Sequence, residues 1–213
     1  MSLTLSSPDD SPTALRRKRE IADAARAELM EKGVEGLRMR AIAKRAGINI
    51  ATLHYHANGK EGLIGLVAAS IADDFMEQRN RTPRDDWSGL KQLIQELKDF
   101  RALRNERPDI HPLMASLSRR APSDPNIAQF ITPMNAAWER KLQTIMARGR
   151  SDGSLRASLD PLAAAQLYIF TVIAVGSHGR DPNEFAVIAC ELLRAFASDP
   201  NQDFERLLDD FDR

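Results

Sequence analysis

The chain has 213 residues, of which 43% are hydrophobic and 28% charged, and its formal net charge is zero. With 11 glycines, 11 prolines and one cysteine, Cys190, this composition excludes a collagen-like, low-complexity or disulfide-stapled protein. The longest apolar run, Leu162 to Gly176, has 15 residues, whereas a membrane-spanning helix needs about 20. The first residues also lack the pattern of a signal peptide, so we expect a cytoplasmic protein.

Helix-forming residues dominate the sequence, and β-branched residues alternating with period two are absent, so we predict an all-α protein. Residues 1–13 are rich in Ser, Pro and Asp, which is typical of a disordered tail. Gly33 is positioned as a C-cap and Asn49 as an N-cap. We predict four helices in the N-terminal part, over residues 15–32, 39–45, 49–56 and 59–80.

The spacing of a helix-turn-helix occurs at Ala43, Gly47 and Leu53. A small residue lets the two helices approach, a glycine permits a left-handed turn, and an apolar residue anchors the second helix. Such a unit places its second helix in the major groove of DNA. An ordinary corner between two helices also favours glycine, so the spacing alone leaves both interpretations open.

The residues around this spacing resemble the DNA-binding domain of TetR-family transcriptional regulators. The resemblance runs from about Arg17 to Phe75 and rests on Arg40, Ile42, Ala43, Ala46, Gly47, Ile48, Thr52, Leu53, Tyr55, Gly59, Lys60 and Glu61, followed by Leu63 and Ile64. It implies an N-terminal three-helix helix-turn-helix domain with a connecting helix, residues 14–81, and a C-terminal helical ligand-binding and dimerisation domain, residues 82–213. Residues 14–81 hold 13 Lys and Arg against 9 Asp and Glu, and this basic balance suits contact with phosphates.

The resemblance also implies which side chains meet double-stranded DNA. The implied set is Arg40, Asn49, Ile50, Ala51, Thr52, His54, Tyr55, His56 and Lys60. Arg40 is expected to read a base edge, because an arginine can bind guanine O6 and N7 together. Lys60 is expected to face a phosphate at the first turn of its helix, where free backbone N–H groups attract anions. The basic cluster from Arg16 to Arg19 is either a solvated face or a further phosphate or minor-groove contact.

Residues 82–86 mark the expected domain boundary. Beyond it we predict helices over residues 87–106, 111–120, 126–148, 161–177 and 182–196, and a short amphipathic segment over residues 204–211. The helix over residues 161–177 is apolar nearly all round, which is typical of a helix buried on every side. We therefore expect a homodimer with a four-helix interface, formed by Leu162, Ile169, Ile173, Phe185, Ile188, Leu192 and Phe196.

Methionine and aromatic side chains in the C-terminal domain can line an adaptable apolar pocket. Plain core packing explains each of them separately, but the resemblance implies that this region holds an effector. The expected lining is Leu97, Phe100, His111, Met114, Met134, Trp138 and Tyr168. We expect a small, mostly apolar molecule, with His111 as a polar contact.

These features predict a ligand-responsive repressor that binds a pseudo-palindromic operator as a dimer. The alternative is a constitutive or architectural DNA-binding protein without an effector. An enzyme is the remote alternative: His54, His56 and Glu61 suggest a metal site, but helical positions two apart point in different directions. The sequence has no nucleophile elbow, phosphate loop or Cys/His cluster, so we expect no enzymatic activity, no metal and no cofactor.

Overall fold

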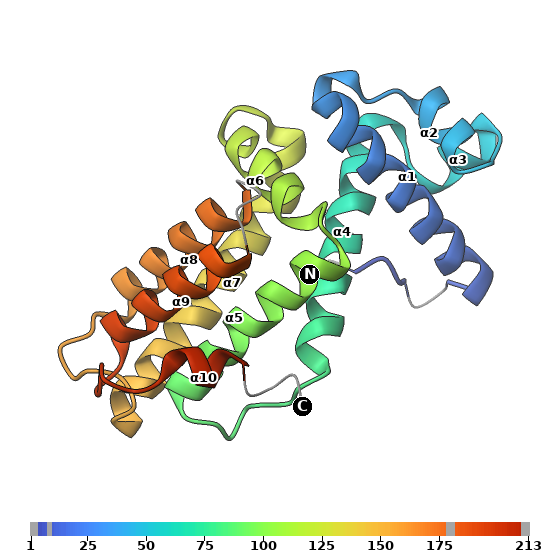
Figure 1. Ribbon diagram of the computed structural model, residues 1–213. Coiled ribbons are helices and arrows are strands. Elements are labelled where there is room, and N and C mark those ends of the chain that lie inside the picture. Colours follow the sequence, from blue (N-terminus) through green and yellow to red (C-terminus); the bar gives the residue numbers. More distant parts are fainter. Residues whose placement is uncertain (1–3, 8–9, 178–181, 210–213) are drawn as a thin grey trace. The chain divides into compact units, whose positions relative to one another are not determined.

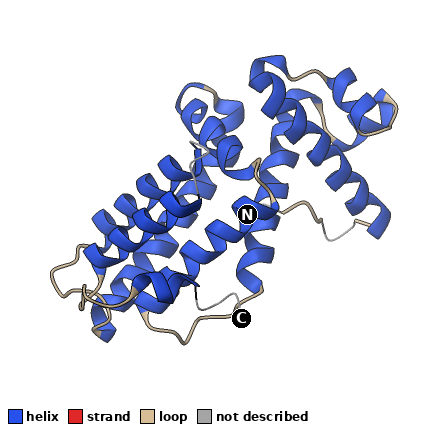
Figure 2. Ribbon diagram, in the orientation of Figure 1, coloured by secondary structure: helices blue, strands red, loops and turns tan. Residues whose placement is uncertain are grey.

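The structure is a computed structural model that describes residues 4–7, 10–177 and 182–209, and these residues form an all-α protein, as predicted (Figures 1 and 2). An isolated bridge between Leu155 and Ala197 is the one β-type pairing in these ranges. The elements are α1 (Pro12–Gly36), α2 (Met39–Arg45), α3 (Ile50–His56), α4 (Gly59–Asn80), α5 (Gly89–Glu106), α6 (Ile110–Arg120), the 3-10 turn η1 (Ala121–Ser123), α7 (Pro125–Asp152), α8 (Pro161–Ser177), α9 (Pro182–Phe196) and α10 (Phe204–Asp209).

The helix boundaries follow local signals in the sequence. Helices α2, α8 and α9 have the predicted bounds, and Asn49 caps α3 as predicted, because its side chain accepts a hydrogen bond of 2.7 Å from the backbone N–H of Thr52. Helix α7 is longer than predicted. It contains Pro133 and ends just before Gly153, whose φ of 78° lies in the left-handed region.

The chain divides into two compact units. Unit 1 consists of Met1–Asn80 and Pro112–Met134, and unit 2 consists of Arg81–His111 and Asn135–Arg213. The contacts therefore add α6 from Pro112 onward, η1 and the first part of α7 to the unit that holds the N-terminal helices. The division of the sequence into domains at residue 81 stays a prediction.

In unit 1, the tail before α1 contacts the helices of the unit. Disorder was expected over residues 1–13, but Leu5 is 3% exposed and packs in a small apolar cluster with Ala22 of α1 and Ala69 of α4. In the structure one well-placed leucine thus gives an otherwise polar tail an apolar anchor. The disorder expected over residues 1–13 stays a prediction.

The separate segment of unit 1 packs on the N-terminal half of α4. A Cβ atom added to Gly65 would lie 2.9 Å from Cζ of Phe130, so glycine lets the aromatic ring approach the helix backbone. The side-chain amide of Gln129 donates a 2.8 Å hydrogen bond to Glu61. Residues from α7 therefore complete the surroundings of α4.

Unit 2 has one large apolar core, built from α5, α7, α8, α9 and α10. Helices α5 and α7 approach with backbone against backbone, since a Cβ atom on Gly89 would lie 2.3 Å from the Cα atom of Gly149. Asp152 also accepts a 2.8 Å hydrogen bond from the N–H of Gly89. Although α8 is strongly apolar, no helix in the described part of the chain is long and apolar enough to cross a membrane.

Candidate nucleic-acid interface

The turn between α2 and α3 has the geometry that the helix-turn-helix spacing predicts. Gly47 has a φ of 65°, its N–H donates to the carbonyl of Lys44 at 3.2 Å, and the N–H of Ile48 donates to the carbonyl of Ala43 at 2.9 Å. These two bonds make a Schellman motif, which satisfies the last carbonyls of α2. Leu53 is fully buried and fastens α3 to the unit. The frame therefore holds α3 in a defined orientation.

Helix α3 exposes apolar and aromatic side chains. Ile50 is 39% exposed and Tyr55 is 86% exposed, and Ala51 and His54 are exposed as well. Thr52 is half-buried. Large side chains that stay in solvent on one short helix are typical of a surface that contacts a partner.

Helix α2 adds positively charged side chains beside the exposed side chains of α3. Arg40 and Lys44 are exposed, lie four positions apart on the same side of the helix, and form no ion pair or hydrogen bond with the described residues. Arg45, by contrast, is held by Glu31 at 2.7 Å and by Glu28 at 3.6 Å. The sequence interpretation missed Lys44, although its spacing of four from Arg40 is a signal that could have found it.

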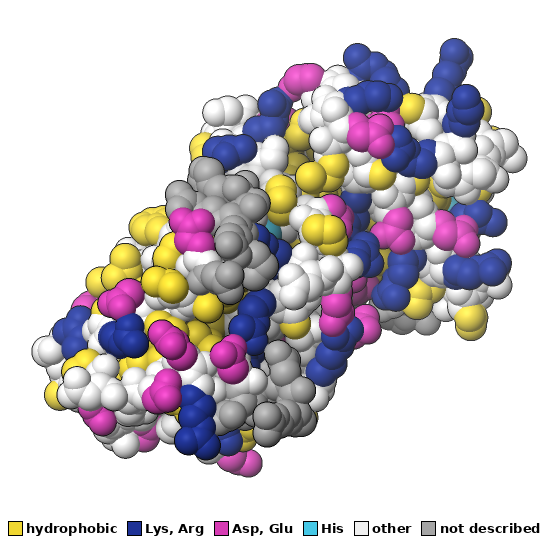
Figure 3. All heavy atoms as spheres, viewed as in Figure 1, with side chains coloured by type: hydrophobic (Ala, Val, Ile, Leu, Met, Phe, Trp, Pro, Cys, Tyr) yellow, Lys and Arg dark blue, Asp and Glu magenta, His cyan; other side chains and the backbone are white. Residues whose placement is uncertain are grey.

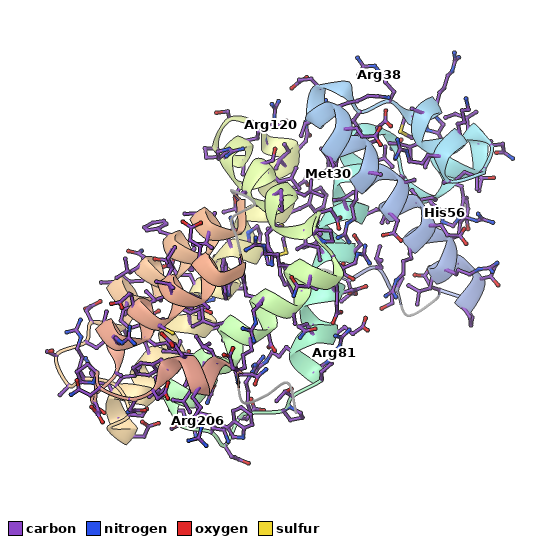
Figure 4. The ribbon with its side chains drawn as sticks, in the orientation of Figure 1. Met30, Arg38, His56, Arg81, Arg120 and Arg206 are labelled. Carbon is purple, nitrogen blue, oxygen red and sulfur yellow. The ribbon has the colours of Figure 1, made fainter. Side chains whose placement is uncertain are left out.

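Lys60 occupies the first turn of α4, as predicted, and its side chain is 42% exposed. Its Nζ atom lies 3.8 Å from Oε2 of Glu35, and the other carboxylate oxygen of Glu35 accepts a hydrogen bond from Arg120 (Arg120 is labelled in Figure 4). An exposed pair of this kind contributes only about 0.2–1 kcal/mol. A phosphate can therefore replace Glu35 beside Lys60 at little cost.

His56 ends α3 and lies beside α1 (Figure 4). Its ring meets the ring of Tyr55 edge to face, with centroids 5.0 Å apart. Burial, and then the positive charges of Lys18 and Arg17, lower the pKa of His56. The lowered pKa favours the uncharged imidazole, which can offer a phosphate a single N–H donor.

The metal site considered for His54, His56 and Glu61 has no support in the geometry. His54 is exposed on α3, whereas His56 is half-buried, in keeping with positions two apart on a helix. Across the residues that the structure describes, no group of three His, Cys, Asp or Glu side chains is placed to hold a metal ion.

The residues expected to line an effector pocket divide between the two units. Leu97, Phe100 and Tyr168 are buried in the core of unit 2, and Trp138 packs against that core. His111 belongs to unit 2 as well. The remaining two, Met114 and Met134, are half-buried members of unit 1.

His111 is buried and stacks on Phe100, with ring centroids 3.8 Å apart. Its Nε2 atom lies 3.3 Å from the carbonyl oxygen of Phe100, so the Nε2–H tautomer donates there. Burial is the main cause that lowers the pKa of His111 to about 4. A Cβ atom on Gly176 would lie 2.6 Å from the Phe100 ring, so glycine leaves room for this stack. His111 is therefore a neutral, packed side chain.

The core of unit 2 also contains a charged cluster that the sequence interpretation missed. The side chain of Arg84 is 1% exposed, donates to Asp99, and lies 3.3 Å from Glu96. Lys141 donates to the same Glu96 at 2.8 Å. Burial, and then the charges of Glu96 and Asp99, raise the pKa of Tyr168 above its usual value. Tyr168 therefore belongs to a polar neighbourhood as well as to the apolar core.

Three of the residues expected at a dimer interface are core residues of their own chain. Phe185, Leu192 and Phe196 are 4%, 6% and 1% exposed, and all three pack in the apolar core of unit 2. In the single chain the apolar stripe of α9 faces α10, α5 and α8, and the expected dimer interface stays a prediction. Ile169, Ile173 and Ile188 are half-buried.

Helices α8 and α9 nevertheless expose an apolar surface, on other positions (yellow over α8 and α9 in Figure 3). Phe170 is 68% exposed and Val187 60% exposed, and Leu167 and Leu162 follow at 49% and 42%. Of these four, only Leu162 was in the expected set. We call these four residues, Leu162, Leu167, Phe170 and Val187, the apolar patch.

Comparison with known proteins identifies the N-terminal part of the chain. Residues 21–67 match the sequence model of the bacterial regulatory proteins of the tetR family. The matched range contains α2, the turn and α3, and it ends within α4.

Solved structures extend the similarity of fold to most of the chain. A transcriptional regulator of the TetR family from Agrobacterium tumefaciens is 17% identical, with a TM-score of 0.73 over 85% of this chain and 98% of that one. A putative TetR-family regulator from Rhodococcus sp. is 21% identical, with a TM-score of 0.73 over 84% and 96%. The transcriptional regulator FadR from Bacillus subtilis, solved in complex with stearoyl-CoA, is 18% identical, with a TM-score of 0.68 over 90% and 97%.

Proposed function

Because this chain has the N-terminal domain and the fold of the tetR family of bacterial regulatory proteins, we propose that it is a repressor that binds a pseudo-palindromic DNA operator as a homodimer. The observation that carries the proposal is the face formed by α2 and α3. It combines exposed Ile50 and Tyr55 with two cations, Arg40 and Lys44, that have no acidic partner in the described ranges. Apolar side chains can pack on thymine methyl groups, and arginine can bind guanine.

The roles of the cations lead to the first test. Lys60→Ala is expected to weaken binding to every duplex by a similar factor and to lower the slope of log K against log salt by about 0.9, because one phosphate contact is lost. Arg40→Ala is expected to cost about 1–3 kcal/mol and to relax preference at one base position. Fluorescence anisotropy with operators selected from a random-sequence pool measures both effects.

Arg45→Ala provides the matched control for that test, since Arg45 lies on the same helix as Arg40 but is paired with Glu31. We expect it to leave base preference unchanged. If Arg40→Ala and Lys60→Ala both kept the affinity and base preference of the parent protein, the proposal that the face formed by α2 and α3 binds DNA would be wrong.

The homodimer part of the proposal rests on the apolar patch of α8 and α9. A two-fold axis that pairs each patch with its copy buries these side chains in a self-complementary interface. Each operator half-site then receives one helix-turn-helix.

The effector part of the proposal concerns unit 2, where Leu97, Phe100 and Tyr168 form an apolar core beside the charged cluster around Arg84. We propose a mostly apolar effector with a polar group, in keeping with stearoyl-CoA bound to the related FadR from Bacillus subtilis. The effector must bind the form that does not bind DNA more tightly, because only differential affinity shifts the population.

Tryptophan fluorescence tests this part. In a Trp87→Phe variant, Trp138 is the remaining tryptophan, and it packs against the core of unit 2. Stearoyl-CoA is expected to change its emission and to release DNA, whereas coenzyme A without an acyl chain is expected to do neither. Unchanged emission and unchanged DNA binding with both molecules would instead favour a constitutive DNA-binding protein.

A further inference from the structure

The tail of unit 1 is fastened at two points, an apolar one and a charged one. Buried Leu5 donates its N–H to Oδ2 of Asp73 at 3.2 Å. The Nζ atom of Lys18 donates to Oδ2 of Asp10 at 2.6 Å and to the carbonyl of Leu5 at 3.4 Å. The same Asp10 oxygen accepts a 2.7 Å hydrogen bond from the N–H of Ser7. The tail therefore holds the carboxylate of Asp10 against the side chain of Lys18.

Lys18 differs from its neighbours in the basic cluster at the start of α1. Arg16 and Arg17 pair with Glu20 of their own helix, at 3.8 Å and 2.6 Å. Lys18 is paired with a residue outside the helix, and the side chains of Lys18 and Asp10 are only 19% and 14% exposed. The tail therefore covers this lysine.

Lys18 lies near the face formed by α2 and α3, which we call the DNA face. Helix α1, which carries Lys18, lies beside His56 at the end of α3 (Figure 4). In keeping with that placement, burial and then the positive charge of Lys18 lower the pKa of His56, and Asp10 acts on the same imidazole in the opposite direction. His56 ends α3 and belongs to the set expected to face phosphates. A duplex that lies along α3 therefore brings its backbone toward Lys18.

We propose that Lys18 is a further phosphate-binding residue and that Asp10 occupies its phosphate site in the free protein. The inference rests on the proposed function, because it concerns the same DNA face. When DNA binds, a phosphate oxygen replaces Oδ2 of Asp10 at Nζ of Lys18, and the carboxylate moves into solvent. The tail acts as an internal competitor that lowers affinity for any duplex, regardless of sequence.

The proposed competition predicts a change in salt dependence, although salt screens simple repulsion between Asp10 and DNA as well, so the double-mutant cycle below is what separates the two explanations. Salt weakens the Asp10–Lys18 ion pair as well as the contact with phosphate. In the parent protein these two effects oppose each other, whereas only the phosphate contact responds to salt once Asp10 is neutral. The affinity of an Asp10→Asn variant is therefore expected to fall more steeply with salt than that of the parent.

The experiment is a double-mutant cycle in the full chain, with a short fluorescein-labelled duplex of mixed sequence as the probe and anisotropy as the measurement. At low salt Asp10→Asn is expected to bind about two- to fivefold more tightly than the parent, the range set by an ion pair of this kind. Lys18→Gln is expected to bind more weakly, and its salt slope is expected to fall by less than the value of about 0.9 for a free phosphate contact, because the ion pair with Asp10 offsets part of that slope in the parent. In the Lys18→Gln background, Asp10→Asn should change affinity little.

Two further variants serve as controls for the position of the tail and for the loss of a negative charge. Circular dichroism establishes that each variant is folded. Leu5→Ala removes the apolar anchor of the tail but keeps both charges, and it is expected to tighten binding as Asp10→Asn does. Asp199→Asn removes the same charge from unit 2 and is expected to leave affinity unchanged.

If Asp10→Asn raised the affinity for the duplex by the same factor in the parent and in the Lys18→Gln background, Asp10 would act by general repulsion of DNA. That result would overturn the proposal. An Asp10→Asn variant with parental affinity and salt slope would overturn it as well. In both cases the parent still binds duplex DNA, so the proposed function stands. A parent that fails to bind the duplex even at low salt would overturn both.

Discussion

Replacing Arg84 with methionine is expected to lower the free energy of unfolding by about 3–5 kcal/mol, because it leaves the largely buried carboxylate of Asp99 without its cation. The side chains of Asp99 and Glu96 are only 13% and 9% exposed. Lys141 still contacts Glu96 in the variant, but among the described residues Asp99 keeps only its hydrogen bond from the side-chain amide of Gln95, at 2.8 Å. Urea denaturation followed by circular dichroism measures the loss.

Arg81→Met is the matched control for this prediction. Arg81 also pairs with an acid, Glu106, at 2.7 Å, but both side chains are 47% exposed. We expect this control to cost less than about 1 kcal/mol. Adding Asp99→Leu to Arg84→Met should recover part of the stability, because an apolar pair leaves no uncompensated charge at that position. Equal losses in Arg81→Met and Arg84→Met would contradict a buried role for Arg84.

Phe170→Asp is expected to convert a dimer into a monomer. Phe170 is 68% exposed in the single chain, so the substitution leaves the core of unit 2 intact. In the proposed interface it places two unpaired charges, one from each copy, among apolar side chains, which costs several kcal/mol. Light scattering should give twice the chain mass of 23.8 kDa for the parent and the single mass for the variant.

Met76→Asp controls for the effect of adding a charge to an exposed apolar position. Met76 is 52% exposed, but it lies on α4 rather than on the apolar patch. We expect this variant to remain a dimer. A parent that is monomeric at micromolar concentration, or a Phe170→Asp variant with the parental mass, would contradict the proposed interface.

The DNA-binding part of the fold was the most predictable from sequence, because its signals are local. Asn49 caps α3 through its own side chain, and Gly47 turns the chain through its own backbone. Each signal acts within a few residues, so one sequence suffices to read it. The fold class and most helix boundaries were predictable for the same reason.

The faces of α8 and α9 were less predictable. Helix α8 is apolar nearly all round, so no stripe distinguishes its buried face from its exposed one, and Phe170 is exposed although Leu192 of α9 is buried. The charged cluster had no local signal either. Arg84 comes from a polar stretch that reads as a solvated boundary, and only the tertiary contact with α5 reveals its acidic partners.

The unit that carries the helix-turn-helix is assembled from two stretches of chain, since Pro112–Met134 belongs to it together with Met1–Asn80. A ribosome must therefore synthesise the chain as far as Met134, more than half of its length, before every part of this unit exists. Until then, α4 lacks its contact with Phe130, whose aromatic ring packs against Gly65. A fragment cut after Asn80 lacks Phe130 and the rest of Pro112–Met134 permanently.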